Sequence, residues 1–310
     1  MPMKMKNTII ILLVLVIVGA GFILPAEAVT GELVILHSND LHGRIEVGEG
    51  LLGLPGISGL ISRHRAEHEH VLVMDAGDTI HGRPITNLLQ GESTVAGMNR
   101  AGYDVMVPGN HDFNFGYERL LELEEMMEFD LVAANVSRDG ELLFAPYVIK
   151  DMGDFEVGVI GLATPDTVST THPANIRGLE FTDMVAAAGK YTEILQDRGV
   201  DLIVALGHVG LSGENTSVRV VEAVEGIDIF VDGHSHDRLP EGKWVGDTLI
   251  VQAHEYGKYL GRVLVDLSGE TPSMSAELIP ADVDDLAIDE DLNNLMEEYR
   301  GKARDIMLGN

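Results

Sequence analysis

Residues 32–43 read ELVILHSNDLHG, and this stretch decides how the rest of the chain is interpreted. The first six residues, 32–37, are a short and mostly apolar run, which is typical of a β-strand that is covered on both faces. Asp40 and His42 follow directly, beside Gly43, a residue that permits a tight turn. The stretch therefore predicts a buried strand that ends in a loop carrying a carboxylate and an imidazole.

The same arrangement recurs four times downstream. Strands predicted at 71–75, 104–108, 201–206 and 227–231 are followed by Gly77-Asp78, Gly109-Asn110-His111-Asp112, Gly207-His208 and Gly233-His234-Ser235-His236. Because loops after the carboxyl ends of strands converge on one crevice of an α/β sheet, we expect these five loops to meet. Carboxylates, imidazoles and one carboxamide are ligands that suit divalent ions such as Mn²⁺, Zn²⁺ or Fe²⁺.

Helical and extended patterns alternate along the chain. Further strands are predicted at 131–135, 156–161, 248–252 and within 255–268, and helices at 57–68, 93–100, 117–128, 183–198 and 215–224. This alternation predicts an α/β fold of layered sheets flanked by helices. The acid-rich segment 281–299 begins an amphipathic terminal helix, which we expect to pack on the domain or on a partner. At the end of the first helix, His64 and His68 lie one turn apart and could bind adventitious metal, but a solvent-facing, mixed-charge helix end is favoured.

The composition excludes several classes of function. The 310 residues include no cysteine, 21 Lys and Arg and 50 Asp and Glu, with a formal net charge of −29. A chain without cysteine has no disulfide, no thiolate metal site and no cysteine nucleophile. The strong negative charge argues against a nucleic-acid polymer as partner, because phosphate backbones bind Lys and Arg.

Residues 1–28 have the features of a signal peptide. Lys4 and Lys6 precede an apolar run of 16 residues at 9–24, and Ala26-Glu27-Ala28 supplies a cleavage-site pattern. A membrane-spanning helix usually needs about 20 apolar residues, so cleavage is favoured over an uncleaved N-terminal anchor. Both alternatives predict an extracytoplasmic domain (secreted, cell-surface or periplasmic), which only an uncleaved segment would attach to the membrane.

In their order along the chain, these motifs resemble those of the calcineurin-like metallophosphoesterases. Three segments narrow the resemblance to the branch of secreted 5′-nucleotidases, UDP-sugar hydrolases and 2′,3′-cyclic-nucleotide phosphodiesterases: SNDLHG (38–43), GLATP (161–165) and GKYLGR (257–262). The resemblance covers about residues 32–308. It implies an α-β-β-α sandwich of two mixed sheets over residues 29–285. Residues 286–310 resemble a helix that connects to a second domain, and no second domain is expected to follow.

The resemblance also implies a catalytic centre with two metal ions. One ion is held by Asp40, His42, Asp78 and His236, and the other by Asp78, Asn110, His208 and His234. Two ions about 3.5–4 Å apart share a hydroxide, which attacks the phosphorus of a nucleotide phosphoester. His111 resembles the family's catalytic histidine, which stabilises or protonates the leaving oxygen.

Asn114 departs from the pattern of the nucleotidase members, which normally have Asp three positions after the catalytic histidine. We expect the Asn114 carbonyl to accept a proton from the ring of His111, without a charge that favours the protonated ring. Asn at this position resembles the cyclic-nucleotide phosphodiesterase members. The choice between monoesterase and cyclic phosphodiesterase therefore stays open.

Substrate contacts are sparse in the sequence. Relatives in this branch usually have a second domain with aromatic and arginine side chains for the substrate, whereas this chain offers Arg44 as a phosphate contact and Phe113, Phe115 and Tyr256 as stacking rings. Either selectivity is broad, or a separate partner chain completes the site. The alternative to an enzyme is a secreted metal-binding or assembly module with little activity of its own. A thiosulfate-processing relative is a weaker third interpretation.

Overall fold

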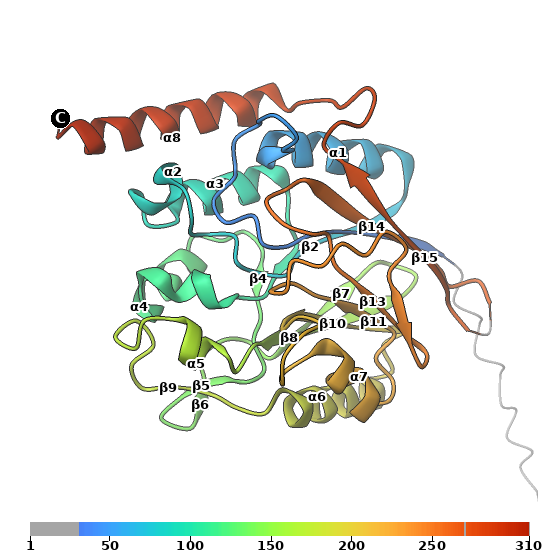
Figure 1. Ribbon diagram of the computed structural model, residues 1–310. Coiled ribbons are helices and arrows are strands. Elements are labelled where there is room, and N and C mark those ends of the chain that lie inside the picture. The colour runs from blue at the N-terminus through green and yellow to red at the C-terminus, as the bar shows by residue number, and fades with distance from the viewer. Residues whose placement is uncertain (1–30, 270, 310) are drawn as a thin grey trace, which may run out of the picture.

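The computed structural model describes residues 31–269 and 271–309 (Figure 1). The signal peptide or anchor predicted over residues 1–28 lies outside them. Within the described ranges, none of the helices combines the length and the apolar character that crossing a bilayer requires.

The first of two large sheets is mixed. Its strand β1 runs parallel to β2, and β3 and β4 continue the parallel half, while β14 and β15 join antiparallel on the other side of β1. The order across the sheet is β15 (Ser273–Pro280), β14 (Tyr259–Asp266), β1 (Glu32–Ser38), β2 (His70–Asp75), β3 (Val105–Met106) and β4 (Asp130–Leu131).

The second large sheet is also mixed. Its four central strands are parallel, and each edge strand pairs antiparallel with its neighbour. The order is β12 (Lys243–Val245), β13 (Thr248–Val251), β11 (Ile229–Val231), β10 (Leu202–His208), β8 (Glu156–Ala163) and β7 (Tyr147–Asp151). A small third sheet contains β6 (Glu141–Leu142), β5 (Val136–Arg138) and β9 (Leu179–Phe181).

Alternating side chains along the strands divide the interior into three apolar layers. In β1, Leu33 and Ile35 pack between the two sheets, whereas Val34 and Leu36 pack under the helices of the first sheet. A third apolar cluster lies between the second sheet and its own helices. This arrangement confirms the predicted α-β-β-α sandwich of two mixed sheets.

Helices cover the outer face of each large sheet (Figure 1). The first sheet is covered by α1 (Gly53–Glu67), α3 (Glu92–Ala101) and α4 (Tyr117–Glu124), and the second by α6 (Met184–Arg198) and α7 (Ser217–Ala223). The terminal helix α8 (Glu290–Leu308) lies across α1, α2 and α3 and buries Leu292, Met296, Tyr299 and Ala303. Three short helices lie in the loops: α2 (Pro84–Asn87), the 3₁₀ helix η1 (Asn110–Phe115) and α5 (Thr167–Thr170).

Some predicted boundaries were wrong. The strand predicted at 131–135 is only the two-residue β4, and the helix predicted at 117–128 ends at Glu124. The acid-rich residues before Glu290 are not helical, because Asp289 caps α8 by accepting a hydrogen bond from the backbone N–H of Leu292. The edge strand β15 was not predicted, since its outward-facing residues are exposed and only its pairing with β14 makes it a strand.

Candidate active site

The five loops predicted to converge do meet, at the carboxyl edges of the parallel strands. Those after β1, β2 and β3 come from the first sheet, and those after β10 and β11 from the second. Together they surround a pocket of about 500 Å³, lined by His42, Arg44, Asp78, His81, Gly82, Asn110, His111, Thr170, His234, His236 and Tyr256.

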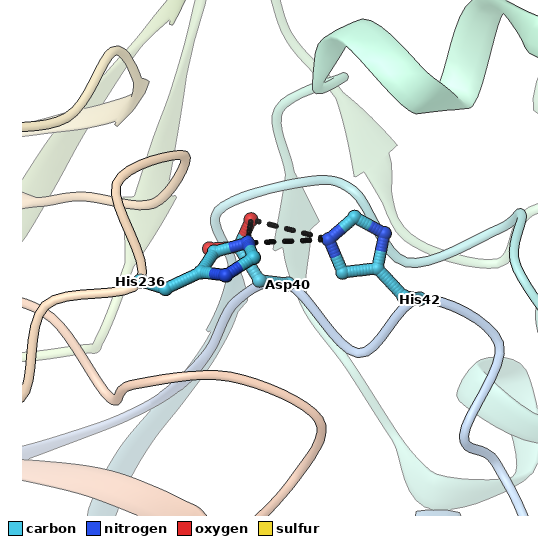
Figure 2. A group of neighbouring side chains, drawn as sticks. All are labelled: Asp40, His42 and His236. Atoms are coloured by element: carbon cyan, nitrogen blue, oxygen red, sulfur yellow. Dashed lines mark hydrogen bonds and ion pairs between the residues drawn. The ribbon is translucent and has the colours of Figure 1, made fainter.

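Asp40, His42 and His236 form the first group of potential ligands. Figure 2 shows the two imidazoles directed toward the carboxylate of Asp40 from different loops. His236 Nε2 lies 3.2 Å from Asp40 Oδ1, and His42 Nε2 lies 3.8 Å from the same oxygen. The two Nε2 atoms are 3.3 Å apart. One divalent ion could therefore contact all three side chains.

Asp78, His208 and His234 form the second group, whose ligand atoms lie within 4.8 Å of one another. Asp78 Oδ2 is 3.3 Å from His208 Nε2 and 3.8 Å from His42 Nε2. This carboxylate therefore faces both groups, as the bridging position requires. Asn110, on the adjacent loop, lines the same pocket.

Three buried atoms in this region lack hydrogen-bond partners among the described residues. They are Asp40 Oδ1, Asn110 Oδ1 and His208 Nε2. Leaving a polar atom buried and unpaired costs free energy, which a bound cation would offset. The donor set of imidazoles, carboxylates and one amide oxygen also fits a divalent ion of the Mn²⁺, Zn²⁺ or Fe²⁺ kind. The residues present thus fit a pair of metal ions.

The backbone is strained at most of the expected ligands. Five of the seven have positive φ angles, a region that residues other than glycine rarely adopt: Asp40 (53°), His42 (45°), Asp78 (56°), His234 (74°) and His236 (56°). Each such residue costs of order 1–3 kcal/mol, and such strain persists where the surrounding structure holds it in place. The strained residues are concentrated in the converging loops. This indicates that the loops hold the ligand side chains in place at a cost to local backbone stability.

Two buried aspartates, whose importance the sequence analysis missed, hold the loops in place. Asp112 accepts hydrogen bonds from the backbone N–H groups of Asp78, Thr79, Ile80 and Gly109, so it joins the loops after β2 and β3. Asp232 accepts from Val209, Gly210 and Gly233, and joins the loops after β10 and β11. Each lies beside the expected ligands in the sequence, but the identity of its distant donors was not visible there.

The imidazole rings are oriented by acceptors on their far side. His208 Nδ1 lies 2.7 Å from the carbonyl oxygen of Ala76, and His236 Nδ1 lies 2.8 Å from Glu255 Oε2. Such partners fix the tautomer, which leaves the Nε2 lone pair for a metal ion. Glu255 is a third residue that sequence reasoning missed, because it follows β13 and belongs to none of the five motifs.

The pKa values of Asp78 and the neighbouring histidines are strongly shifted by burial and by one another. Burial alone would raise the pKa of Asp78, but His208 outweighs it and holds this pKa well below its usual range. Burial alone would likewise lower the pKa of His208, yet Asp78 raises it to about 10, so a bound cation would take the place of the proton between these two side chains. Burial lowers the pKa of His42 to about 4, so this imidazole is neutral and its lone pair is available at neutral pH.

His111 and Asn114 lie together at the pocket. Asn114 Nδ2 is 2.8 Å from His111 Nδ1 and 3.2 Å from His81 Nδ1, and the rings of His81 and His111 stack in parallel. The amide nitrogen of Asn114, rather than its carbonyl oxygen, therefore faces His111, which differs from the sequence-based expectation. With Nδ1 accepting from the amide, the proton of a neutral ring is placed on Nε2.

Of the candidate substrate contacts, Arg44 and Tyr256 line the pocket. The Arg44 guanidinium stacks 3.4 Å from the centre of the Tyr256 ring, so the two side chains form one wall. Phe113 is fully buried in the core of the first sheet, so this ring is a core aromatic and not a stacking surface for substrate. Phe115 packs on His81, behind the pocket lining.

Comparison with known proteins agrees with this geometry. The calcineurin-like phosphoesterase family matches residues 33–238. A 5′-nucleotidase of Vibrio cholerae is 34% identical over 290 residues, which are 82% of this chain and 52% of that protein. The chain spans about half the length of the curated relatives it matches.

Two solved structures have the same fold. The 5′-nucleotidase precursor of Thermus thermophilus superposes with a TM-score of 0.74 at 29% identity, over 89% of this chain and 60% of that one. The sulfate thiohydrolase SoxB of the same genus has a TM-score of 0.79 at 23% identity, over 89% and 61% of the two chains. The second likeness concerns the fold alone. Because the family match covers more than half of its residues, the chain belongs to the calcineurin-like phosphoesterase family.

Proposed function

We propose that this protein is a phosphohydrolase that uses two divalent ions to hydrolyse nucleotide phosphoesters. The observation that carries the proposal is the pair of ligand groups that the Asp78 carboxylate faces, with buried ligand atoms that lack hydrogen-bond partners among them. One ion would be held by Asp40, His42, Asp78 and His236, and the other by Asp78, Asn110, His208 and His234. The ion pair, when bound, supplies an acidified water as nucleophile and neutralises charge on the phosphoryl oxygens.

The other side chains of the pocket contribute binding and proton transfer. His111 can donate the proton on its Nε2 to the leaving oxygen, because Asn114 occupies its Nδ1. The Arg44 guanidinium is held at the pocket by Tyr256 and can bind a phosphoryl oxygen. Nucleotides are proposed as substrates because the similar proteins are named 5′-nucleotidases, and the choice between 5′-monoesters and 2′,3′-cyclic diesters is decided by the assay below.

The test is a hydrolysis screen of the purified protein reconstituted with Mn²⁺, Zn²⁺ or Fe²⁺. Its substrates are 5′-nucleotides, 2′,3′-cyclic nucleotides and UDP-sugars in parallel. We expect turnover of at least one nucleotide class and a loss of at least about 10³-fold in Asp78→Asn. The exposed Asp151→Asn is the matched control and should retain full activity. Turnover that persists in Asp78→Asn would mean that a contaminant is responsible.

A second candidate function is a metal-binding module that needs a partner chain to complete its substrate site. It is favoured by the pocket lining, in which Arg44 and Tyr256 are the candidate substrate contacts. Metal binding without turnover of any substrate class would support this alternative. We further infer an extracytoplasmic location from residues 1–28, and a mature protein that begins at Val29 would support signal cleavage.

A further inference from the structure

A second cluster of potential ligands lies at the end of α1, apart from the active-site pocket. Its members are His64, Glu67 and His68, whose ligand atoms all lie within 4.8 Å of one another. The backbone N–H of His68 still donates to the carbonyl of His64 at 2.9 Å, which keeps the two imidazoles one helical turn apart. None of the three lines the pocket of the candidate active site.

His64 is buried, in contrast to the solvent-facing position that the sequence predicted. Its exposed fraction is 2%, and neither ring nitrogen has a hydrogen-bond partner within residues 31–269 and 271–309. Burial, followed by the nearby Arg262, lowers the pKa of His64 to about 4, so its ring is neutral at neutral pH. A buried neutral imidazole whose N–H and lone pair both lack partners is costly for the fold, and its lone pair is well suited to a metal ion.

His68 is arranged in the same way as the metal-binding histidines of known sites. Its Nδ1 lies 2.7 Å from Glu32 Oε1, on the neighbouring strand β1, which leaves Nε2 for a ligand. A carboxylate behind the ring fixes the tautomer and makes the imidazole a better donor. The cluster therefore contains a ligand set and also a partner that orients one ligand.

The surrounding charges permit a cation. Two guanidinium groups, Arg63 and Arg262, line the groove beside His64. Arg262 is paired with Glu277 at 2.8 Å, and Glu67 and Glu32 add two carboxylates beside the histidines. A groove of about 470 Å³, lined in part by His64, Glu67 and Arg262, leads to the cluster. An ion can thus reach the buried ring.

We propose that His64, Glu67 and His68 bind one zinc ion in addition to any metal in the active site. Two imidazoles and one carboxylate are a common zinc ligand set, which leaves the fourth tetrahedral position for water. Residues 64–68, HRAEH, also have the H-x-x-E-H spacing, in which the two histidines of one class of zinc enzymes bind the ion. The bound ion would fasten the end of α1 to β1 through His68 and Glu32. This proposal does not depend on the proposed phosphohydrolase function.

The test counts zinc ions in the full chain. Wild type and variants are dialysed against buffered free Zn²⁺ at about 1 µM, a concentration above the dissociation constants of structural zinc sites. Bound zinc per chain is then measured by elemental mass spectrometry. Wild type should retain one more equivalent than His68→Gln, and Glu67→Gln should bind the extra ion at least about tenfold more weakly. The matched control is Glu69→Gln, an exposed carboxylate outside the cluster, which should bind as wild type does.

Thermal unfolding gives a second readout that does not depend on catalysis. At about 100 times the dissociation constant, zinc should raise the Tm of wild type by about 5 °C more than that of His68→Gln. The variants His68→Gln and Glu67→Gln should hydrolyse phosphoesters as wild type does, because neither residue lines the pocket of the candidate active site. Equal zinc content in wild type and His68→Gln, or no zinc retained by either at this cluster, would overturn the proposal, whether or not the protein proves to be a hydrolase.

Discussion

Asp78 is the side chain through which the two ligand groups are connected. Its Oδ1 accepts the backbone N–H of His111 at 2.7 Å, while its Oδ2 faces the imidazoles of His42 and His208. The positive φ of Asp78 places the carboxylate in this position, and the carboxylate of Asp112 binds the backbone N–H of the same residue. The strain at a single residue is thus offset by contacts from the next loop, which explains why it can be maintained.

Replacing Asn114 by Asp tests whether the residue beside His111 sets the pH dependence of the reaction. A carboxylate at this place favours the protonated ring, which the amide does not. We expect the alkaline limb of the pH–rate profile to move to higher pH by about one unit for nucleotide monoesters. Aryl phosphates serve as the internal control, because their leaving group needs little protonation and should respond less. Identical profiles of Asn114→Asp and wild type on both substrate types would exclude the role.

Glu255 is predicted to act on metal affinity through His236. In Glu255→Gln the ring loses the charged partner at its Nδ1, and loss of such a partner typically weakens metal binding 10–100-fold. Competition with a chelating dye measures this loss directly, and the Mn²⁺ dependence of hydrolysis measures it in the active protein. Glu241→Gln, at an exposed position, is the matched control. An unchanged Mn²⁺ dissociation constant in Glu255→Gln would contradict the assignment.

At the scale of elements, the sequence predicted the strands and loops that carry the ligands better than the contacts that hold them. The runs at 32–37, 71–75, 156–161 and 201–206 are confirmed as strands because buried parallel strands need continuous apolar residues. The roles of Asp112, Asp232 and Glu255 depend on backbone groups and rings from distant loops, which local patterns do not encode. The same reason explains why β15 was missed and why His64, apparently part of a polar helix end, is buried.

Asp112 is predicted to be necessary for the position of the loops after β2 and β3. In Asp112→Asn an amide N–H₂ faces backbone N–H groups that now bind a carboxylate oxygen, so two buried donors lose their acceptor. We expect the free energy of unfolding to fall by about 3 kcal/mol, as measured by urea denaturation, and metal affinity to fall with it. Asp139→Asn, whose side chain is 91% exposed, should change stability by less than about 0.5 kcal/mol. If both variants unfold at the wild-type midpoint, the carboxylate does not hold the loops.

His37, on β1, is predicted to make stability depend on pH. The ring is fully buried against Gly261 of β14, and burial lowers its pKa to about 3, whereas an unfolded histidine has a pKa of about 6.5. Between these values the unfolded chain binds a proton that the folded chain does not, so the stabilisation is complete above pH 6.5 and is lost as pH falls toward 3. Between these two pH values His37 changes the free energy of unfolding by about 1.4 kcal/mol per pH unit.

The variant His37→Leu isolates this contribution. Other buried groups have opposite slopes, such as Asp75, whose pKa is raised to about 7 by burial, but they are present in both proteins. Urea denaturation at pH 7, 6 and 5 should therefore show a difference between variant and wild type that changes with pH below 6.5. A difference that stays constant over this range would show that His37 is not responsible.

At the scale of the whole molecule, the candidate site is where the two sheets are connected. The first sheet contributes Asp40, His42, Asp78 and Asn110 through its loops, and the second contributes His208, His234 and His236. Elsewhere an apolar layer packs between the sheets, and Lys150 of β7 forms an ion pair with Asp130 of β4 at 2.6 Å. With a net charge of −29, the chain also repels itself, and bound cations would reduce this repulsion locally.

Bound metal ions are therefore predicted to stabilise the contact between the two sheets, in addition to taking part in hydrolysis. Because each ligand group contains residues from loops of both sheets, removal of the ions should lower the thermal stability of the whole domain. We expect the Tm of the Mn²⁺-loaded protein to fall by at least about 5 °C when a chelator is added, since a ligand at 100 times its dissociation constant contributes about 2.7 kcal/mol. Mn²⁺ is chosen because the imidazole cluster at the end of α1 should bind it weakly. In Asp78→Asn the chelator should have little effect on the Tm, whereas a fall equal to that of wild type would locate the stabilising ions elsewhere in the protein.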